Sequence, residues 1–314
     1  MANYVETMRK TAGKAYDSIY EDVSRLVFVD FPDYPNVGDS AIALGQFAYY
    51  RSRGLVVERC YCIGTLTPKV LESQIPVVIN GGGNIAGFFD GIDAHRNDIS
   101  SRLRGDTLLI QAPQSVHFAT ESAKKKFTEY FASRPALRMA VRDQQAVDAL
   151  KGIIEDPLLA PDAVHHLGRI EAADPSQRVV ILKRKDKESA SKADLESSVD
   201  WLRDSASLRI GAFLRWKGKY VGRGAELLNL SPGGWERVAK RRLARGIQIL
   251  APGEVVITDR LHAMLIALQM GRRVIAVDNA NQKLSKYANT WFQSAQPDIT
   301  FASSFEQAMQ LARK

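Results

Sequence analysis

The stretch Val255-Val256-Ile257-Thr258-Asp259-Arg260-Leu261-His262 indicates how this chain folds, because a short apolar strand runs directly into an apolar-periodic helix. Thr258 or Asp259 can cap that helix, so Arg260 and His262 fall in its first turn. The first turn has unpaired N–H groups and the positive end of the helix dipole, which favour a bound anion. A fixed cation and a titratable imidazole there suit a phosphate or carboxylate substrate whose reaction needs a proton. An arginine paired with a carboxylate and a histidine packed in the core would fit the same residues.

The same alternation of strand and helix fills the first half of the chain. Apolar runs predict strands, and amphipathic patterns predict helices. The expected strands are 25–31, 55–61, 75–80, 106–111 and 137–142, and the expected helices are 39–50 and 143–151. Apolar strands interleaved with helices indicate a parallel sheet covered on both faces.

Residues 167–178 break the pattern, which then restarts. The expected strands are 179–182, 207–214, 255–257 and 273–277, and the expected helices are 194–205, 235–250, 261–270 and 305–313. A chain of 314 residues is comfortable for two domains. The sequence therefore predicts an α/β fold of two Rossmann-like domains, residues 1–170 and 178–314, with a central cleft between them.

The composition is that of a globular enzyme, with 45% hydrophobic and 25% charged residues and no run long enough to span a membrane. The N-terminus has no apolar signal core, so we expect a cytoplasmic protein. The net charge of +8 is unevenly spread: residues 1–168 are net −2, whereas residues 169–314 are net +10. An anionic ligand, an anionic membrane surface or nucleic acid bound by the second half would each explain this asymmetry.

The only two cysteines, Cys60 and Cys62, are spaced for one face of a strand. That spacing is poor for a disulfide, and two ligands do not complete a metal site. We therefore expect core thiols and neither disulfide nor metal.

Polar and glycine-rich turns follow several strands, where doubly wound sheets bind ligands. The candidates for the cleft or acceptor site are Asn36, Gly38, Asp39, Gly81, Gly82, Gly83, Asn84, Gln114 and Ser115. Three successive glycines expose backbone amides that can cradle an anion. Neither a dinucleotide fingerprint nor a Walker loop is present, and Asn36 to Ser40 taken alone fits a simple capped turn.

Cations gather where strands of the second half end. The run 183–188 contains Arg184 and follows a strand, and 279–287 contains Lys283 and follows another. Together with Arg260, these strand ends predict an anion pocket. The helix 235–250 is basic and amphipathic, with Lys240, Arg241, Arg242 and Arg245 expected to face outward. It fits a soluble surface helix or a contact with an anionic membrane or a lipid diphosphate.

In order along the chain, these junctions resemble those of the polysaccharide pyruvyl transferase family. The matching motifs are Asn36-x-Gly38-Asp39, Gly81-Gly82-Gly83-Asn84, Gln114-Ser115, Arg142-Asp143, Pro161-Asp162, Asp259-Arg260-Leu261-His262 and Asn279-x-x-x-Lys283. They extend from about residue 35 to 291. The resemblance implies a fold similar to GT-B glycosyltransferases.

The resemblance also implies that pyruvate passes from phosphoenolpyruvate to two sugar hydroxyls, forming a cyclic ketal. The donor would bind the second domain at Arg184, Arg260, Leu261, His262, Asn279 and Lys283, while the first domain would take the acceptor. His262, the only histidine of the basic half, would supply the proton, and Arg260 would hold the anion and stabilise the departing phosphate. The reaction needs no cofactor and no metal, since cations neutralise the phosphate.

The expected partners are phosphoenolpyruvate and a lipid-diphosphate-linked oligosaccharide at the inner face of the cell membrane, with no nucleic acid. Two alternatives share parts of the pattern. A GT-B glycosyltransferase with a sugar-nucleotide donor would have the same fold, and a non-catalytic polyanion- or lipid-diphosphate-binding protein would need only the basic helix. The missing fingerprint disfavours a nicotinamide oxidoreductase.

Overall fold

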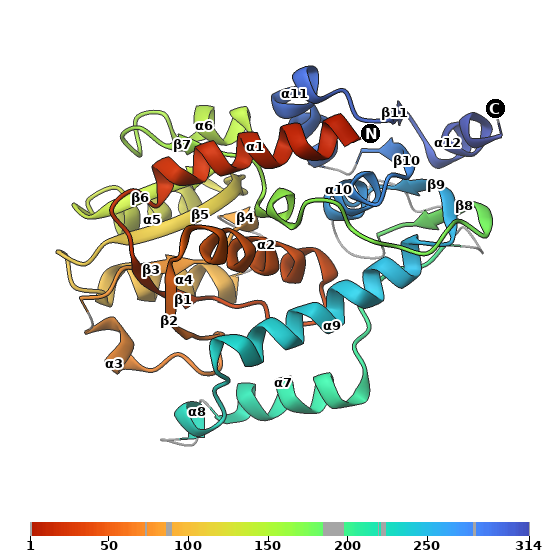
Figure 1. Ribbon diagram of the computed structural model, residues 1–314. Coiled ribbons are helices and arrows are strands. Elements are labelled where there is room, and N and C mark those ends of the chain that lie inside the picture. The colour runs from red at the N-terminus through yellow and green to blue at the C-terminus, as the bar shows by residue number, and fades with distance from the viewer. Residues whose placement is uncertain are drawn as a thin grey trace.

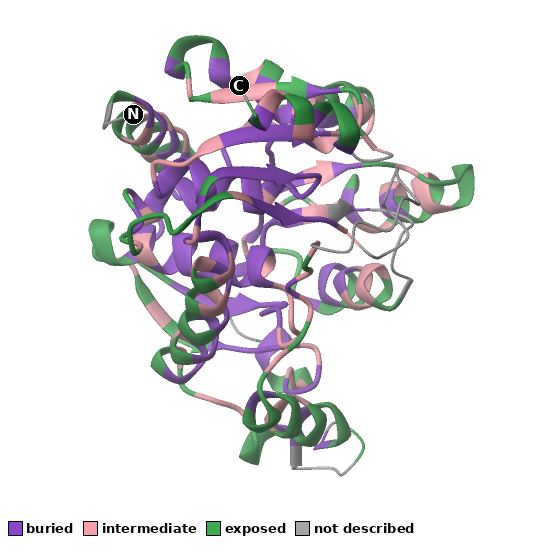
Figure 2. Ribbon diagram, turned by 90° about the vertical axis from the view of Figure 1, so that its right-hand side faces the viewer, coloured by how far each residue is buried: buried purple, intermediate pink, exposed green. Residues whose placement is uncertain are grey.

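A computed structural model describes residues 2–72, 74–85, 90–184, 198–218, 220, 224–278 and 281–313. Within these ranges the chain forms two parallel sheets with helices packed against them (Figure 1). The mixed α/β architecture expected from the sequence is therefore confirmed. Both sheets are buried at the centre, and the exposed residues lie mainly on the outer helices and loops (Figure 2).

The first sheet is formed by seven strands of the described chain, which are β1 (Arg25–Val29), β2 (Val56–Cys60), β3 (Val77–Ile79), β4 (Gly82–Ile85), β5 (Leu109–Val116), β6 (Leu137–Val141) and β7 (Leu158–Leu159). Their order is β2-β1-β3-β5-β6-β7, with β4 paired to β5. The order reverses between β1 and β3, and doubly wound sheets bind ligands beyond the carboxyl ends of strands at such a switch point. The turns that leave β1 and β3 carry the motifs around Gly38 and Gly81.

The second sheet has the order β11-β10-β9-β8 and is also parallel. Its described strands are β8 (Gln177–Leu182), β9 (Gly253–Thr258), β10 (Arg273–Val277) and β11 (Ile299–Ala302). The expected strands at 179–182, 255–257 and 273–277 all lie within these elements.

Alternate residues of the first sheet contribute to two different cores. Leu26 and Phe28 of β1 pack in one cluster with α1 (Ala2–Ile19) and α2 (Val37–Arg53). Val27 and Val29 pack in another with α4 (Asp90–Arg102), α5 (Glu121–Phe131) and α6 (Gln144–Leu150). This period of two shows that both faces of the sheet are covered.

Two helices connect the cores of the two halves. In α1, Tyr16 packs in the core of the first sheet, whereas Tyr4 packs in a cluster with residues of the second half. In α9 (Pro232–Leu250), Trp235 packs in the core of the first sheet, whereas Leu250 packs in the cluster with residues of the second half. The apolar core is therefore continuous across the junction, and the division at residues 170 and 178 stays a prediction.

Two expected elements are wrong. The expected strand 207–214 is part of a helix, α7 (Ala206–Gly218). The described part of the expected helix 194–205, residues 198–205, is not helical and contains one isolated bridge, between Leu182 and Val199. The run 207–214 is apolar enough to fit either structure, and packing of Leu208 and Arg215 against the body selects the helix.

The expectation that Arg242 and Arg245 of α9 face outward is also wrong. Arg242 is fully buried, and its guanidinium donates to the Pro32 carbonyl at 2.7 Å and pairs with Asp204 at 2.8 Å. Arg245 also pairs with Asp204 and is 22% exposed. Only Lys240 and Arg241 lie on the exposed side, as expected.

Cys60 and Cys62 are free and buried, which confirms the core thiols. Burial raises the pKa of the Cys60 thiol well above its usual range, so it stays protonated and packs as a small apolar group.

Candidate active site

The junction that leads from β9 to α10 (Leu261–Gln269) is tied to its neighbouring strand by Thr258. The Thr258 hydroxyl donates to the Leu182 carbonyl of β8 at 2.7 Å and accepts from the Arg260 N–H at 3.1 Å. Arg260 occupies the N-cap position without a capping side chain, and His262 lies in the first turn. Because its first N–H groups have no capping side chain, this helix end can bind an anion.

Arg260 is buried and already has one carboxylate partner. Its Nη2 lies 2.8 Å from Asp200 Oδ2, and the two side chains are 5% and 10% exposed. The pair fixes the direction of the guanidinium group. It also offsets part of the positive charge that the sequence analysis expected to bind an anionic substrate.

Asp259 forms a hydrogen bond with the segment that follows strand β8. Its Oδ1 accepts the Arg184 N–H at 2.8 Å, and burial raises the pKa of this carboxyl group. Residues 185–188 of the predicted basic run, together with Asn279, lie outside the described residues.

His262 reaches across to the first half of the chain. Its Nε2 lies 3.1 Å from Asp162 Oδ2, and the same oxygen accepts from Arg142 Nη1 at 2.7 Å. Burial alone would raise the pKa of Asp162, but the charges of His262 and Arg142 and several hydrogen bonds hold it well below its usual range. The three side chains form an acid–base cluster at the junction of the two halves.

The geometry assigns roles to the two ring nitrogens of His262. Arg142 Nη1 lies 3.4 Å from Nε2, farther than the Asp162 oxygen, so we assign the Nε2 proton to the carboxylate. Nδ1 is then the atom left to take up or release a proton. A Cβ at Gly38 would stand 2.5 Å from Nδ1, so only glycine leaves room beside this edge of the ring.

Asp162 also holds its own backbone in place. Its Oδ1 accepts from the Val164 N–H at 3.0 Å and caps the 3-10 helix η1 (Ala163–Leu167), while its N–H donates to the Tyr287 hydroxyl at 2.9 Å. One carboxylate thus serves both as the cap of η1 and as the partner of His262.

Ser115 fixes the other end of Arg142. Its hydroxyl accepts from Arg142 Nε at 2.9 Å and donates to Asp143 Oδ2 at 2.5 Å. Asp143 in turn caps α6 by accepting from the Ala146 N–H. Ser115 therefore belongs to the cluster because it contacts Arg142, and not because of a contact with His262.

The glycine-rich turn joins the same region. Lys283, the first residue of α11 (Lys283–Ala295), donates to the Gly83 carbonyl at 2.9 Å. A Cβ at Gly83 would collide with Arg142 Nη2. Gly83 therefore lets Lys283 and the buried Arg142 approach strand β4 of the first half.

Other predicted residues have mainly structural contacts. Asn36 caps α2 by accepting from the Gly38 N–H at 2.9 Å, and its amide donates to Asp39 at 2.7 Å. Gln114 is fully buried and donates to the Asn80 carbonyl at 3.1 Å. Gly81 lies close to the Pro113 carbonyl, and Leu261 is buried in the shared core.

The site residues predicted from the sequence did not include four of the partners found here, which are Arg142, Asp162, Asp200 and Tyr287. The first two stand in motifs of the family pattern, so that pattern was an available signal. Asp200 and Tyr287 had none, since their roles depend on distant segments meeting in space.

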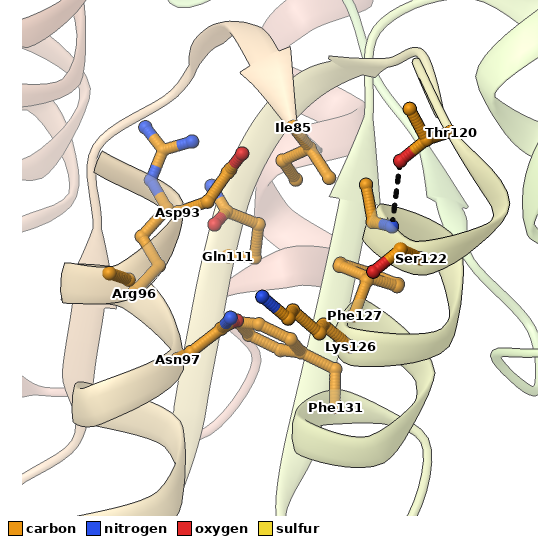
Figure 3. Close-up of a pocket in the computed structure, with 12 residues that line it drawn as sticks. Ile85, Asp93, Arg96, Asn97, Gln111, Thr120, Ser122, Lys126, Phe127 and Phe131 are labelled. Atoms are coloured by element: carbon orange, nitrogen blue, oxygen red, sulfur yellow. Dashed lines mark hydrogen bonds between the residues drawn. The ribbon is translucent and has the colours of Figure 1, made fainter. Parts of the chain in front are cut away.

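A separate cavity of about 480 Å³ lies between α4 and α5, and none of the clustered residues line it. Figure 3 shows Gln111 at its base with Arg96 on one side and Lys126 and Phe127 on the other. We place the candidate site at His262 rather than in this cavity, because the titratable and cationic groups converge there. Among the described residues, no three His, Cys, Asp or Glu side chains are grouped to hold a metal.

Comparison with known proteins defines the class. The model of the family described as polysaccharide pyruvyl transferase matches residues 36–281, and the chain belongs to this family. It is therefore a transferase, and family membership favours pyruvyl transfer over the glycosyltransferase and non-catalytic alternatives.

Individual relatives agree with this assignment. The chain is 28% identical to "Pyruvyl transferase 1" of Schizosaccharomyces pombe, over 90% of this chain and 73% of the relative. It is 24% identical to "Putative pyruvyl transferase EpsO" of Bacillus subtilis, over 86% of each. A solved structure of an uncharacterized protein from Klebsiella pneumoniae matches with a TM-score of 0.60 and 18% identity, over 95% of this chain and 99% of that one, which shows the fold alone.

Proposed function

We propose that this enzyme transfers pyruvate from phosphoenolpyruvate to two hydroxyls of one sugar in a polysaccharide repeat unit. The products are a cyclic ketal and inorganic phosphate. The observation that carries the proposal is His262, held by Asp162 beside the buried Arg142 at the junction of the two halves.

The reaction starts with a proton. Protonation of the methylene carbon of phosphoenolpyruvate makes C2 an oxocarbenium-like centre, which a sugar hydroxyl attacks. Loss of phosphate regenerates such a centre, and the second hydroxyl closes the ketal. The two hydroxyls release two protons: one replaces the proton consumed at carbon, and the other is taken up by the departing phosphate.

His262 is the group suited to move these protons. Asp162 holds Nε2, so Nδ1 would be the transferring atom. In a serine-protease triad, likewise, the ring nitrogen that the carboxylate does not hold transfers the proton. The side chain of His262 is 12% exposed, so most water is excluded while one edge stays reachable.

Cations at the starts of two helices of the second half would hold the donor. Arg260 lies at an uncapped helix start, where N–H groups and the dipole add to its charge, and Lys283 lies at the start of α11. Phosphoenolpyruvate has a phosphate and a carboxylate, so two cationic positions fit its two anionic groups. Arg184 and Asn279 stay predicted donor contacts.

We infer that the acceptor is a lipid-diphosphate-linked oligosaccharide of an exopolysaccharide pathway, and that it approaches from the first half. Asn36, Asp39 and the turn 81–84 line the switch-point edge on that side. Similarity to EpsO supports the exopolysaccharide assignment.

The test is incubation of the purified enzyme with phosphoenolpyruvate and candidate lipid-linked oligosaccharides. We expect phosphate release, together with a pyruvyl mass increment on the acceptor. The control replaces phosphoenolpyruvate with sugar nucleotides. Sugar transfer from a nucleotide, without pyruvyl transfer, would contradict the proposal and favour a glycosyltransferase.

A further inference from the structure

The helix α7 has an unusual distribution of side chains. It buries Leu208 and Arg215 against the body, and it exposes its large apolar residues. The exposed fractions are 59% for Ile210, 57% for Phe213, 48% for Leu214 and 48% for Trp216, and Tyr220 just beyond the helix is 65% exposed. We call these five residues the α7 apolar face.

Ile210, Phe213, Leu214 and Trp216 include pairs spaced by three and four residues, so these four share one side of the helix, and Tyr220 joins them through its contact with Trp216. Trp216 and Tyr220 meet edge to face with ring centroids 5.7 Å apart. Figure 1 shows α7 at the outside of the molecule, with α9 between it and the sheets. Leu227 of α8 (Gly224–Leu227) is a further exposed apolar residue, at 83%. Contiguous apolar surface of this kind marks an interaction site.

The other side of α7 is firmly attached. Arg215 donates to Asp33 Oδ2 at 2.6 Å and to Oδ1 at 3.1 Å, and its guanidinium lies 4.9 Å from the Trp235 ring centre. A Cβ at Gly64 would stand 2.7 Å from the Arg215 carbonyl oxygen. The helix is therefore held in its orientation, and the exposure of its apolar side is not the result of a loosely placed segment.

Two cations lie among the apolar residues. Arg209 and Lys217 are exposed, and Lys217 Nζ lies 5.0 Å from the Trp216 ring centre and 5.7 Å from that of Phe213. Against a second protein these cations would need carboxylates opposite them. At a bilayer surface their long side chains reach the lipid phosphates while the rings enter the headgroup region.

We propose that α7 is a membrane-surface helix that inserts its apolar face into an anionic bilayer. Trp, Tyr and Phe next to Lys and Arg are typical of interfacial helices. The biological reason for such a contact rests on the proposed function, since a lipid-linked acceptor lies at a membrane surface. It replaces α9 as the membrane contact, because Arg242 and Arg245, two of the four cations expected to face outward there, pair with Asp204 instead.

The experiment measures binding of the full-length protein to vesicles that contain phosphatidylglycerol, with phosphatidylcholine vesicles for comparison. The Phe213→Asp, Leu214→Asp double variant should bind at least about tenfold more weakly, because it removes apolar area and adds repelled charge. The matched control is Val56→Asp, which changes an apolar residue that is 54% exposed on strand β2. The control should bind like the native protein.

Fluorescence gives a second readout. Trp216 is on the α7 apolar face, whereas Trp201 and Trp235 are buried. Vesicles should shift the emission to the blue, and Trp216→Phe should remove most of this shift.

Three outcomes would overturn the proposal. They are no vesicle binding by the native protein, equal binding by the native and double-variant proteins, and conversion of a dimer to a monomer by the double substitution. The last result would assign the face to a second copy of the chain. Pyruvyl transfer to a soluble acceptor, measured in parallel, depends on the donor and acceptor sites and not on the α7 apolar face, so its failure would count against the proposed function and leave the membrane result standing.

Discussion

His262 Nε2 lies 3.1 Å from Asp162 Oδ2, although the two residues are 100 positions apart and come from different sheets of the fold. The contact forms only when the turn after β7 meets the first turn of α10. The histidine that we propose as proton carrier comes from the basic half and is thus oriented by a carboxylate from the acidic half. The relationship makes the arrangement of the two halves part of the chemistry.

We expect His262→Ala to abolish most turnover while the protein stays folded. The substitution removes the proposed proton donor, and such groups contribute roughly 100- to 10,000-fold in rate. The measurement is phosphate release from phosphoenolpyruvate with acceptor present, beside a thermal melt. A variant that keeps more than about a third of the native rate would remove His262 from the mechanism.

Asp162→Asn should slow the same reaction by a smaller factor, since the amide keeps the shape but not the charge that stabilises imidazolium. The exposed Lys240→Ala is a suitable control for both variants. Equal rates for Asp162→Asn and the native enzyme would show that the pair is only structural.

Gly38→Ala tests the space beside the imidazole. The new Cβ would stand 2.5 Å from Nδ1 and 2.7 Å from Cγ of His262, so the imidazole must leave its observed position beside Asp162. We expect activity to fall at least about tenfold, with a smaller effect on the melting temperature, because the ring can rotate instead of breaking the fold. Gly105→Ala is the matched control, since nothing lies within 4 Å of its Cβ position. Native-like turnover in Gly38→Ala would refute the need for this space.

Arg260→Ala should weaken phosphoenolpyruvate binding about tenfold or more, because a charge-assisted hydrogen bond is worth roughly 1.5–3 kcal/mol. It should also lower stability, since it removes the ion pair that Arg260 makes with the mostly buried Asp200. Calorimetric titration and urea unfolding separate the two effects.

A double variant, Arg260→Ala with Asp200→Asn, should recover stability but not donor affinity. Arg260→Lys should restore only part of the affinity, since a point charge cannot replace the guanidinium fork. Unchanged phosphoenolpyruvate affinity in Arg260→Ala would contradict the anion-clamp assignment.

The sequence predicted much of the fold because strand and helix periods are local. The strand 273–277 and the helix over 235–250 appear in the structure at or near their expected bounds. The prediction failed at 207–214, because a short apolar run fits either period and tertiary packing decides between them. That failure also concealed the α7 apolar face, since an exposed apolar side is recognisable only once the helix is known.

The candidate site divides in the same way. Gly38 could be selected because it follows β1, and Arg260 and His262 because they follow β9. In each case the residue lies beyond the carboxyl end of a parallel strand. The pairing of His262 with Asp162, and of Arg260 with Asp200, depends on how the two halves meet. No local pattern encodes these distances. Burial of Arg242 was missed for a related reason, since amphipathic periodicity places an arginine on the polar side and cannot show that an acidic loop covers it.

We expect stability to fall as the pH drops below about 6.5, because two buried histidines stay neutral in the folded chain. Burial lowers the pKa of His165 to about 4 and that of His166 to about 3. In the unfolded chain both groups take up protons near pH 6.5, so the unfolded state binds more protons as acidity rises. Each histidine should then cost up to about 1.4 kcal/mol of unfolding free energy per pH unit, down to its folded pKa.

Urea unfolding across this range checks the slope. His166 packs against the ring of Tyr16 at 4.5 Å between centroids, and His165 Nε2 contacts the Tyr287 hydroxyl at 2.8 Å, so glutamine at each position keeps much of the volume. The double variant should show a flatter pH dependence than the native protein. The same slope in both would exclude these histidines as its cause.

Arg242 should be far more important for stability than its exposed neighbours on α9. It is fully buried, and it donates to the Pro32 carbonyl and pairs with Asp204 and, at 3.3 Å, with Asp33. Removing it takes one cation from each of two buried carboxylates, Asp33 and Asp204, which keep Arg215 and Arg245 as partners, so Arg242→Ala should cost about 3 kcal/mol of unfolding free energy.

The control is Lys240→Ala on the same helix. Lys240 is 63% exposed and pairs only with Glu236 at 2.9 Å among the ion pairs of the described chain, and surface pairs of this kind contribute roughly 0–1 kcal/mol. Chemical denaturation of the two variants gives both values. If Arg242→Ala cost no more than Lys240→Ala, the buried cluster that ties α9 to the loop after β1 would not stabilise the junction. The relative placement of His262 and Asp162 would then have to depend on α1 and the shared apolar core instead.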